Sequence, residues 1–328
     1  MLSLIVQFPG ATSKALRYRS ATLDQSDLIL RGFGSDAHGF AEEESLEMVH
    51  FWGEFGQVPL DGWENKSTES YQNEVSQVLQ KIHQHEVQKV VLSRTHFMST
   101  YAADASATFQ TLCHQFPNCT VFALHHDHFG SWMGATPEVL LEGTEQGFRS
   151  MSLAGTRLSG GMNWGEKEIE EQKFVTKEIH RTLKNLGGHV RRTPQTTFEA
   201  GPVEHLMTWV NTDNRQLEAF ETLEALHPTP AVCGTPTPAA LAVLHEIESY
   251  PRELYTGYLA WVKDTVYANV LLRTMKWHAN GIQFFAGGGI TKDSVPLNEW
   301  METEYKISAL KDAVQLKGQP PSTRHIGL

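Results

Sequence analysis

Two periods of apolar residues alternate along the chain and predict its secondary structure. Between positions 75 and 82 apolar side chains recur every three or four residues, as on one face of a helix, and the β-branched run at 87–94 is typical of a strand. The same reasoning predicts helices at 69–85, 166–186, 238–248 and 297–316, and strands at 120–126, 132–135, 139–142, 148–153, 258–261, 268–275 and 283–285. Thr237 is the expected N-cap of the third helix, with Pro238 at its first position.

The order of these elements indicates the fold class. The strands come in hairpin-like groups between helices rather than as repeated strand–helix units. This arrangement predicts an α+β fold with mainly antiparallel sheets.

Charge and composition narrow the choice of partners. The chain has 27 Lys+Arg against 38 Asp+Glu, a net charge of −11, which argues against a nucleic acid or a membrane as partner but leaves a small anionic substrate possible. None of its three cysteines lies in a CxxC pair, and its first residues lack the basic segment of a signal peptide. We therefore expect a cytoplasmic protein.

One acidic residue lies where an apolar residue is expected. Glu171 precedes Val175 by four positions and Ile179 by eight, so it shares the apolar stripe of its predicted helix. A buried carboxylate must be paired, protonated or bound to a cation. The alternative is that the stripe reaches the surface near the helix start, where an acid suits the helix dipole.

The last predicted helix shows a similar feature. Glu299, Glu302 and Lys306 lie in line with Leu310 on one face. One interpretation is a solvated Glu302–Lys306 ion pair. The other is that two helices each direct a carboxylate into the core, an arrangement suited to Mg²⁺, which takes one or two protein carboxylates and completes its shell with water or substrate.

Two further features have both a structural and a functional interpretation. Lys89 interrupts an apolar strand and shares a face with Val91, which is typical either of an edge strand protected against aggregation or of a desolvated lysine suited to act as a base. The glycines at 287–289 form either a plain turn or a backbone cradle for an anion.

Seven segments in a fixed order resemble one enzyme family. They are KVVLSR at 89–94, ATPE at 135–138, LAGTR at 153–157, HPTPAVCG at 227–234, RELYTG at 252–257, FAGGGI at 285–290 and EWMET at 299–303. Over about residues 68–315 the chain resembles the chorismate-utilising enzymes, which include isochorismate, salicylate, anthranilate and aminodeoxychorismate synthases. The HPTPAV run and Lys89 make the resemblance closest to isochorismate synthase.

This resemblance implies a single fold of two large, mainly antiparallel sheets packed together and flanked by helices. Residues 1–65 would be its N-terminal part, 66–316 the chorismate-binding catalytic region and 317–328 a flexible tail. The implied reaction is the Mg²⁺-dependent conversion of chorismate to isochorismate for menaquinone or siderophore synthesis, without an obligatory glutaminase subunit. The alternatives are a salicylate synthase, an aminodeoxychorismate synthase component and a non-catalytic paralogue.

The resemblance also implies roles for individual residues. Lys89 matches the family's base and Glu138 its acid, which requires a neutral amine and a protonated carboxyl, the opposite of their states in water. Glu171 and Glu302 match the magnesium ligands, with Glu299 binding through water or supporting them. The implied substrate-binding residues are Gly155, Thr156, His205, Tyr255, Arg273, Gly287, Gly288 and Lys306. Gln172 stands where many family members have histidine.

Overall fold

The computed structural model describes residues 1–161 and 163–318. Its helices are α1 (Met48–Glu54), α2 (Thr68–His83), α3 (Ala105–Gln115), α4 (Glu166–Asn185), α5 (Ala219–Leu226), α6 (Thr237–Ile247) and α7 (Pro296–Lys311), with a 3₁₀ turn at Leu23–Gln25. Its strands are β1 (Leu2–Gln7), β2 (Lys14–Ala21), β3 (Leu28–Arg31), β4 (Ala37–Ser45), β5 (Lys89–Ser99), β6 (Ala103–Asp104), β7 (Thr120–His126), β8 (Gly130–Thr136), β9 (Val139–Thr144), β10 (Gly147–Leu158), β11 (Val190–Arg192), β12 (Thr196–Ala200), β13 (Val203–Thr212), β14 (Gly234–Thr235), β15 (Tyr258–Trp261), β16 (Tyr267–Val270), β17 (Thr274–His278), β18 (Gly281–Ile290) and β19 (Gln315–Leu316).

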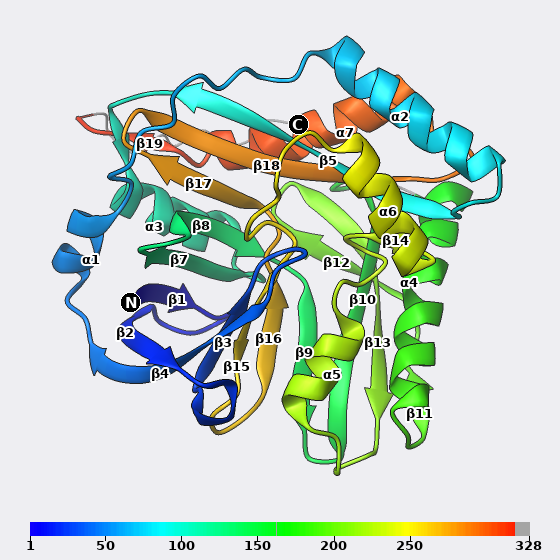
Figure 1. Ribbon diagram of the computed structural model, residues 1–328, viewed down its shortest axis with the longest axis horizontal. Coiled ribbons are helices and arrows are strands. Elements are labelled where there is room, and N and C mark those ends of the chain that lie inside the picture. The colour runs from blue at the N-terminus through cyan, green and yellow to red at the C-terminus, as the bar shows by residue number, and fades with distance from the viewer. Residues whose placement is uncertain (162, 319–328) are drawn as a thin grey trace.

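The strands pair antiparallel, which confirms the predicted α+β class. Seventeen of them are joined by hydrogen bonds into one connected network, and β6 and β19 form a separate pair. In Figure 1, β5, β17 and β18 cross the top of the molecule beneath α2 and α7, whereas β9, β10 and β13 stand at the right beside α4. β1 pairs with β7 and β3 with β15, so the first strands add directly to those that follow.

Most of the predicted elements are present, and the differences have local causes. The predicted N-cap is wrong by one residue, because the capping position is Pro236 and Thr237 is already helical. The last helix ends at Lys311 rather than 316, because 315–316 pair with β6. The strand predicted at 268–275 is two strands, interrupted at 271–273 where Arg273 has a φ of +48°. The short helices α1, α3 and α5 were not predicted.

Helix α4 shows how the apolar period fixes the position of a candidate site residue. Val175, Ile179 and Leu183 are buried and pack in one cluster with Leu140 of β9 and Val210 of β13. This packing fixes the rotation of the helix about its axis, because all three side chains must face the sheet. The face that carries them also carries Glu171 near the start of the helix.

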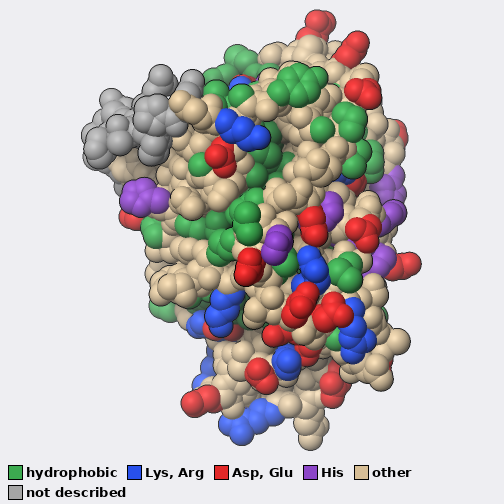
Figure 2. Space-filling view, turned by 90° about the vertical axis from the view of Figure 1, so that its left-hand side faces the viewer, with side chains coloured by type: hydrophobic (Ala, Val, Ile, Leu, Met, Phe, Trp, Pro, Cys, Tyr) green, Lys and Arg blue, Asp and Glu red, His purple; other side chains and the backbone are tan. Residues whose placement is uncertain are grey.

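The surface mixes both signs of charge. On the face drawn in Figure 2, acidic, basic and histidine side chains are interspersed over the lower part.

In the described part of the chain, none of the helices has the length and apolar character needed to cross a bilayer. The predicted flexible tail at 317–328 lies outside the described residues from 319 onward.

The packing of α4 gives a stability prediction. Ile179→Ala should lower the free energy of unfolding by about 2–5 kcal/mol, because it removes buried side-chain volume and leaves a cavity. Urea unfolding followed by circular dichroism measures the change. Lys177→Ala, at an exposed position of the same helix, is the matched control and should change stability by less than about 0.5 kcal/mol. Equal losses in the two variants would contradict the assigned packing.

Candidate active site

A cavity lies where the β5–β18–α7 group of elements meets β10, β13 and α4. It has about 730 Å³ of empty volume including its open mouth, a size typical of small-molecule sites. Ten predicted site residues line it: Glu138, Gly155, Thr156, Glu171, His205, Tyr255, Arg273, Gly287, Glu302 and Lys306. Segments up to 168 residues apart in sequence therefore converge on one space. Lys89, Gly288 and Glu299 lie just behind this lining, in contact with residues that form it or pair with it.

Glu138 is held in an apolar part of the wall between β8 and β9. Its backbone is fixed because its carbonyl oxygen accepts hydrogen bonds from the Val270 amide at 3.1 Å and the Asn269 side chain at 3.2 Å. The residue is 1% exposed. Burial raises the pKa of Glu138 from 4.5 to about 8, although the charge of Lys89 and a hydrogen bond from Thr229 act in the opposite direction. Glu138 is therefore mainly protonated at neutral pH and able to donate a proton.

Lys89 is fully buried within β5. The strand pairs with β18 on one side and with β14 on the other, so the edge-strand interpretation is wrong. Its Nζ atom lies 3.0 Å from Glu171 Oε1, an ion-pair distance, but it has no hydrogen bond of good geometry within the described residues. Buried amines usually fill their hydrogen-bonding capacity with protein groups or water. Lys89 thus has donor capacity left over beside the cavity.

Glu171 faces the cavity, which settles the choice left open by the sequence. It reaches Lys89 from α4 and lines the cavity. Gly289 of β18 makes room for this contact. A Cβ at Gly289 would lie 2.2 Å from Glu171 Oε1 and 3.0 Å from the Cε atom of Lys89. Because 287–289 pair with 91–93 of β5, the glycine run is a strand rather than a turn. Its lack of side chains leaves space for the ion pair.

The two acids of α7 are each matched with a lysine. Glu302 Oε1 accepts a hydrogen bond at 2.7 Å from Lys306, which also donates to the carbonyl oxygen of Gly287. Although burial would raise it, the pKa of Glu302 is lowered by the charges of Lys306 and Lys167. Glu299 is 1% exposed and pairs with Lys167 at 2.6 Å, yet burial and the neighbouring Glu302 charge raise its pKa. The Glu302–Lys306 pair therefore faces the cavity rather than bulk solvent.

Glu171 and Glu302 both line the cavity and could hold a divalent cation that needs few protein ligands. Glu299 Oε2 is buried without a hydrogen-bond partner in the described residues, and a Cβ at Gly288 would lie 3.2 Å from that atom and 3.9 Å from Glu302 Oε1. Within the described ranges, no three His, Cys, Asp or Glu side chains are gathered as a complete metal site. Mg²⁺ does not need one, because it commonly binds through one or two carboxylates and keeps several waters.

The opposite wall is built around a neutral histidine. A guanidinium group can only donate, so the 2.6 Å contact between Arg273 Nη2 and His205 Nε2 makes that nitrogen the acceptor. The proton of His205 then sits on Nδ1, 3.1 Å from the carbonyl oxygen of Gly155. Burial and the charges of Arg273 and Lys306 hold the pKa of His205 well below its ordinary value. His205 thus orients Arg273, a role that the sequence did not indicate.

Local backbone conformations place the anion-binding candidates. Gly155 has a φ of +73° at a β-bulge in β10, where the register with β13 shifts between Ala154 and Thr156. Arg273 also has positive φ, donates to the Ala200 carbonyl oxygen at 2.6 Å and keeps three N–H groups without an acceptor among the described residues. Tyr255 is 4% exposed, and burial raises the pKa of its hydroxyl. Free donors of this kind suit a carboxylate.

Some contacts around the cavity were missed by the sequence analysis. Lys167 precedes Glu171 by one helical turn on the same face, and this spacing could have pointed to it. Thr229 lies 3.5 Å from Glu138 and carried no signal beyond its motif. Gln172 points away from the cavity and is hydrogen-bonded to Ser152, Thr208 and Gln195.

Comparison with known proteins places this geometry in a family. A family model described as "Chorismate binding enzyme" matches residues 56–315. Isochorismate synthase EntC of Escherichia coli is 34% identical over 242 residues, which cover 69% of this chain and 62% of that protein, so the chain matches less than two thirds of this relative's length. Anthranilate synthase component 1 of Aquifex aeolicus is 26% identical over 269 residues, covering 77% of this chain and 54% of that protein.

The fold is shared as well. The solved structure of MenF, the menaquinone-specific isochorismate synthase of Escherichia coli, superposes with a TM-score of 0.78 at 20% identity and covers 96% of this chain and 89% of that one. Because the family model spans most of the chain and the predicted motifs converge on one cavity, the chain belongs to the chorismate-binding enzyme family.

Proposed function

We propose that this protein is an isochorismate synthase that converts chorismate to isochorismate. One observation carries the proposal: a carboxyl group that is protonated near neutral pH lines the cavity within electrostatic range of a buried amine with unused hydrogen-bonding capacity. Such a pair can donate a proton on one side of a ring and accept one on the other. The isochorismate synthases among the relatives are consistent with this chemistry.

The proton transfers balance over the reaction. Lys89, in its neutral form, takes a proton from water as the water oxygen bonds to C2 of the ring. The ring double bonds shift, the C4–oxygen bond breaks, and Glu138 gives its proton to the departing hydroxyl, which leaves as water. The net change is an isomerisation, and the surplus proton on Lys89 returns to Glu138 before the next cycle.

The substrate is a dicarboxylate, and the cavity offers separate groups for its two charges. The free N–H groups of Arg273 and the hydroxyl of Tyr255 suit the enolpyruvyl carboxylate, with the backbone of Gly155 and Thr156 beside them. Lys306 suits the ring carboxylate. The proposed Mg²⁺ ligands are Glu171 and Glu302, with Glu299 acting through water. When bound, this ion supplies positive charge that offsets and orients the ring carboxylate.

The nearest alternatives differ in the product. A salicylate synthase would also eliminate pyruvate, and an aminodeoxychorismate synthase component would add ammonia in place of water. We favour water as the nucleophile because Lys89 matches the position of the base in the water-adding members. We also propose that no glutaminase subunit is required.

The product decides between these reactions. Purified protein is incubated with chorismate and Mg²⁺, with and without ammonium, and the products are separated by chromatography. Isochorismate in both reactions supports the proposal. Stoichiometric salicylate and pyruvate, an aminated product, or unchanged chorismate would each overturn it.

The base role of Lys89 gives a first prediction. Lys89→Ala should lower kcat by about 100- to 10,000-fold, because it removes the proposed base. Steady-state assays measure kcat, and circular dichroism establishes that the variant folds. Lys292→Ala, an exposed lysine after β18, is the control and should keep full activity. A folded Lys89→Ala enzyme with near-normal kcat would refute the assignment.

The raised pKa of Glu138 gives a second prediction. Activity should fall as pH rises through about 8, because the acid loses its proton, and Glu138→Gln should lower kcat by about 100- to 10,000-fold.

The same raised pKa predicts a pH dependence of stability. The folded state binds more protons than the unfolded state between pH 4.5 and about 8, so the free energy of unfolding should decline as pH rises across that window. Glu138→Gln should reduce this decline, measured by thermal unfolding at several pH values. Glu145→Gln, at an exposed turn, should leave it unchanged.

The proposed metal site gives a third prediction. Glu302→Gln should abolish Mg²⁺-dependent activity and weaken Mg²⁺ binding measured by calorimetry at least tenfold, because one carboxylate ligand is lost. The control is Glu304→Gln on the same helix, whose carboxylate pairs with Arg94 instead of facing the cavity. Undiminished Mg²⁺ binding by Glu302→Gln would show that the ion is held elsewhere.

A further inference from the structure

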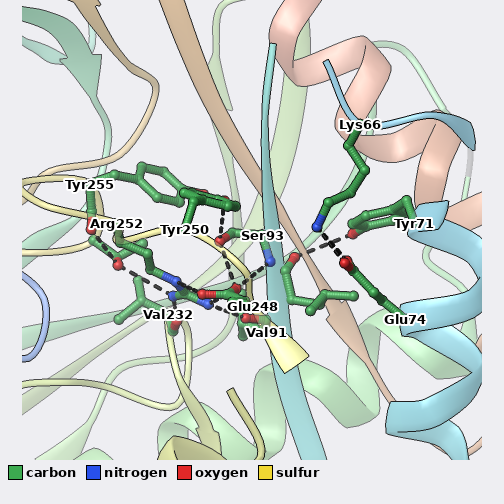
Figure 3. A network of polar contacts seen from close by, with 12 residues as sticks. Lys66, Tyr71, Glu74, Val91, Ser93, Val232, Glu248, Tyr250, Arg252 and Tyr255 are labelled. Atoms are coloured by element: carbon green, nitrogen blue, oxygen red, sulfur yellow. Dashed lines mark hydrogen bonds and ion pairs between the residues drawn. The ribbon is translucent and has the colours of Figure 1, made fainter. Parts of the chain in front are cut away.

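A buried guanidinium group lies directly behind the wall of the cavity. Arg252 follows α6 and is 3% exposed. Each of its five N–H groups has an acceptor at 2.6–3.3 Å, two of them carboxylate oxygens of Glu248 and the others the Val91 carbonyl, the Val232 carbonyl and the Thr256 hydroxyl. Figure 3 shows Arg252 between Val91 and Val232, with Glu248 beside it.

The acceptors other than Glu248 belong to three separate parts of the cavity wall. Val91 belongs to β5, Val232 to the loop before β14, and Thr256 to the turn before β15, and all three line the cavity. Arg252 is not part of this lining. It therefore binds three lining segments from behind, and these segments lie up to 165 residues apart in sequence.

The Arg252–Glu248 pair also completes the edge of β5. Strand β14 pairs with this edge only at Lys89 and Val90. Beyond that point, Arg252 donates to the carbonyl oxygen of Val91 at 2.6 Å, and Glu248 accepts from the Ser93 amide at 2.8 Å. Two side chains thus take the place of a neighbouring strand along Val91–Ser93 of β5. This part of β5 begins two residues after Lys89, the proposed base.

Further bonds fix the orientation of this pair. Glu248 Oε1 accepts a second hydrogen bond from the Ser93 hydroxyl at 2.7 Å, and that hydroxyl lies 2.7 Å from the hydroxyl of Tyr250. The guanidinium carbon of Arg252 is 4.4 Å from the centre of the Phe33 ring. Only a planar group with five donors satisfies all these acceptors, and an ammonium has three donors.

We propose that Arg252 is a positioning residue that sets the separation of β5, the 227–233 loop and the turn at Thr256. Through β5 it places Lys89, and through the loop it places Thr229, which contacts Glu138. The two proton-transfer groups are thereby held on a common scaffold by one side chain that touches neither of them. The kinetic part of this proposal rests on the proposed function, whereas the structural part does not.

The test compares two arginine-to-lysine substitutions. Arg252→Lys keeps the positive charge beside Glu248 but cannot reach all three wall segments. Arg149→Lys is the control, because Arg149 also forms a two-pronged pair with Glu142 at 2.9 Å and stacks on the Trp209 ring at 4.0 Å. Its side chain is 34% exposed, and among the described residues it makes no hydrogen bond to a residue that lines the cavity. Both proteins are studied at a temperature where unfolding curves show them to be fully folded.

Kinetic measurements distinguish a positioning role of Arg252 from a contribution to folding stability alone. In Arg252→Lys we expect kcat per folded molecule to fall at least 30-fold and amide hydrogen exchange of a peptide covering 89–95 to rise at least tenfold. Arg149→Lys should change neither by more than twofold. Unchanged kcat in a folded Arg252→Lys protein, or equal losses in both variants, would overturn the proposal.

A second variant covers the case in which Arg252→Lys does not fold. Glu248→Gln keeps the shape of the partner and should cause smaller changes in the same direction, again in kcat and in exchange at 89–95. An effect on melting temperature alone would overturn the proposal.

Failure of the proposed function is recognised separately, because the unsubstituted protein would then form no isochorismate. In that case the affinity for chorismate, measured by calorimetry, replaces kcat. At least tenfold weaker binding by Arg252→Lys than by Arg149→Lys supports positioning, and equal affinity refutes it.

Discussion

The cost of burying charge governs how this site is built. Three carboxylates converge on the strand that carries the glycine run, and each is met by a lysine side chain: Glu171 by Lys89 of β5, Glu299 by Lys167 of α4, and Glu302 by Lys306 on its own helix. An unpaired charge at these depths would cost several kcal/mol, so each acid constrains where a lysine must lie. Helix α4 therefore cannot shift against β5 or α7 without breaking the Glu171–Lys89 or the Glu299–Lys167 pair. The proposed Mg²⁺ ligands belong to this same group of acids.

Glu138 differs from these acids because no lysine touches it. Among the described residues its carboxyl group has one hydrogen-bond partner, the hydroxyl of Thr229 at 3.5 Å, and burial consequently favours the neutral form of Glu138. The cavity thus holds both Glu138, whose pKa burial raises, and Glu302, whose pKa the charges of Lys306 and Lys167 lower despite burial. Separation of titration behaviour within one site is what an acid and a base need in order to work together at one pH.

Much of the fold and part of the site could be predicted from the sequence. The helical period was strong enough to locate α2, α4 and α6 within a few residues, and it placed Glu171 on an apolar face because side-chain direction follows from the backbone repeat. The order of the motifs pointed to residues that line the cavity, although the sequence shows none of their contacts. The interruption at Arg273 was missed because Leu271 and Leu272 continue an apolar run, so nothing local distinguishes the break from a continuous strand.

The sequence by itself determined the α+β class, the family and many of the residues that line the cavity, since these follow from local periodicity and from residues in a fixed order. Only the tertiary structure decided how those residues are paired. Lys89 meets Glu171 across 82 positions, and Arg252 reaches Val91 across 161, because strands and helices distant in sequence pack side by side. Local patterns do not encode such distances. The charge state of each buried group depends on these neighbours, so the protonation states in the cavity follow from the tertiary structure rather than from local sequence.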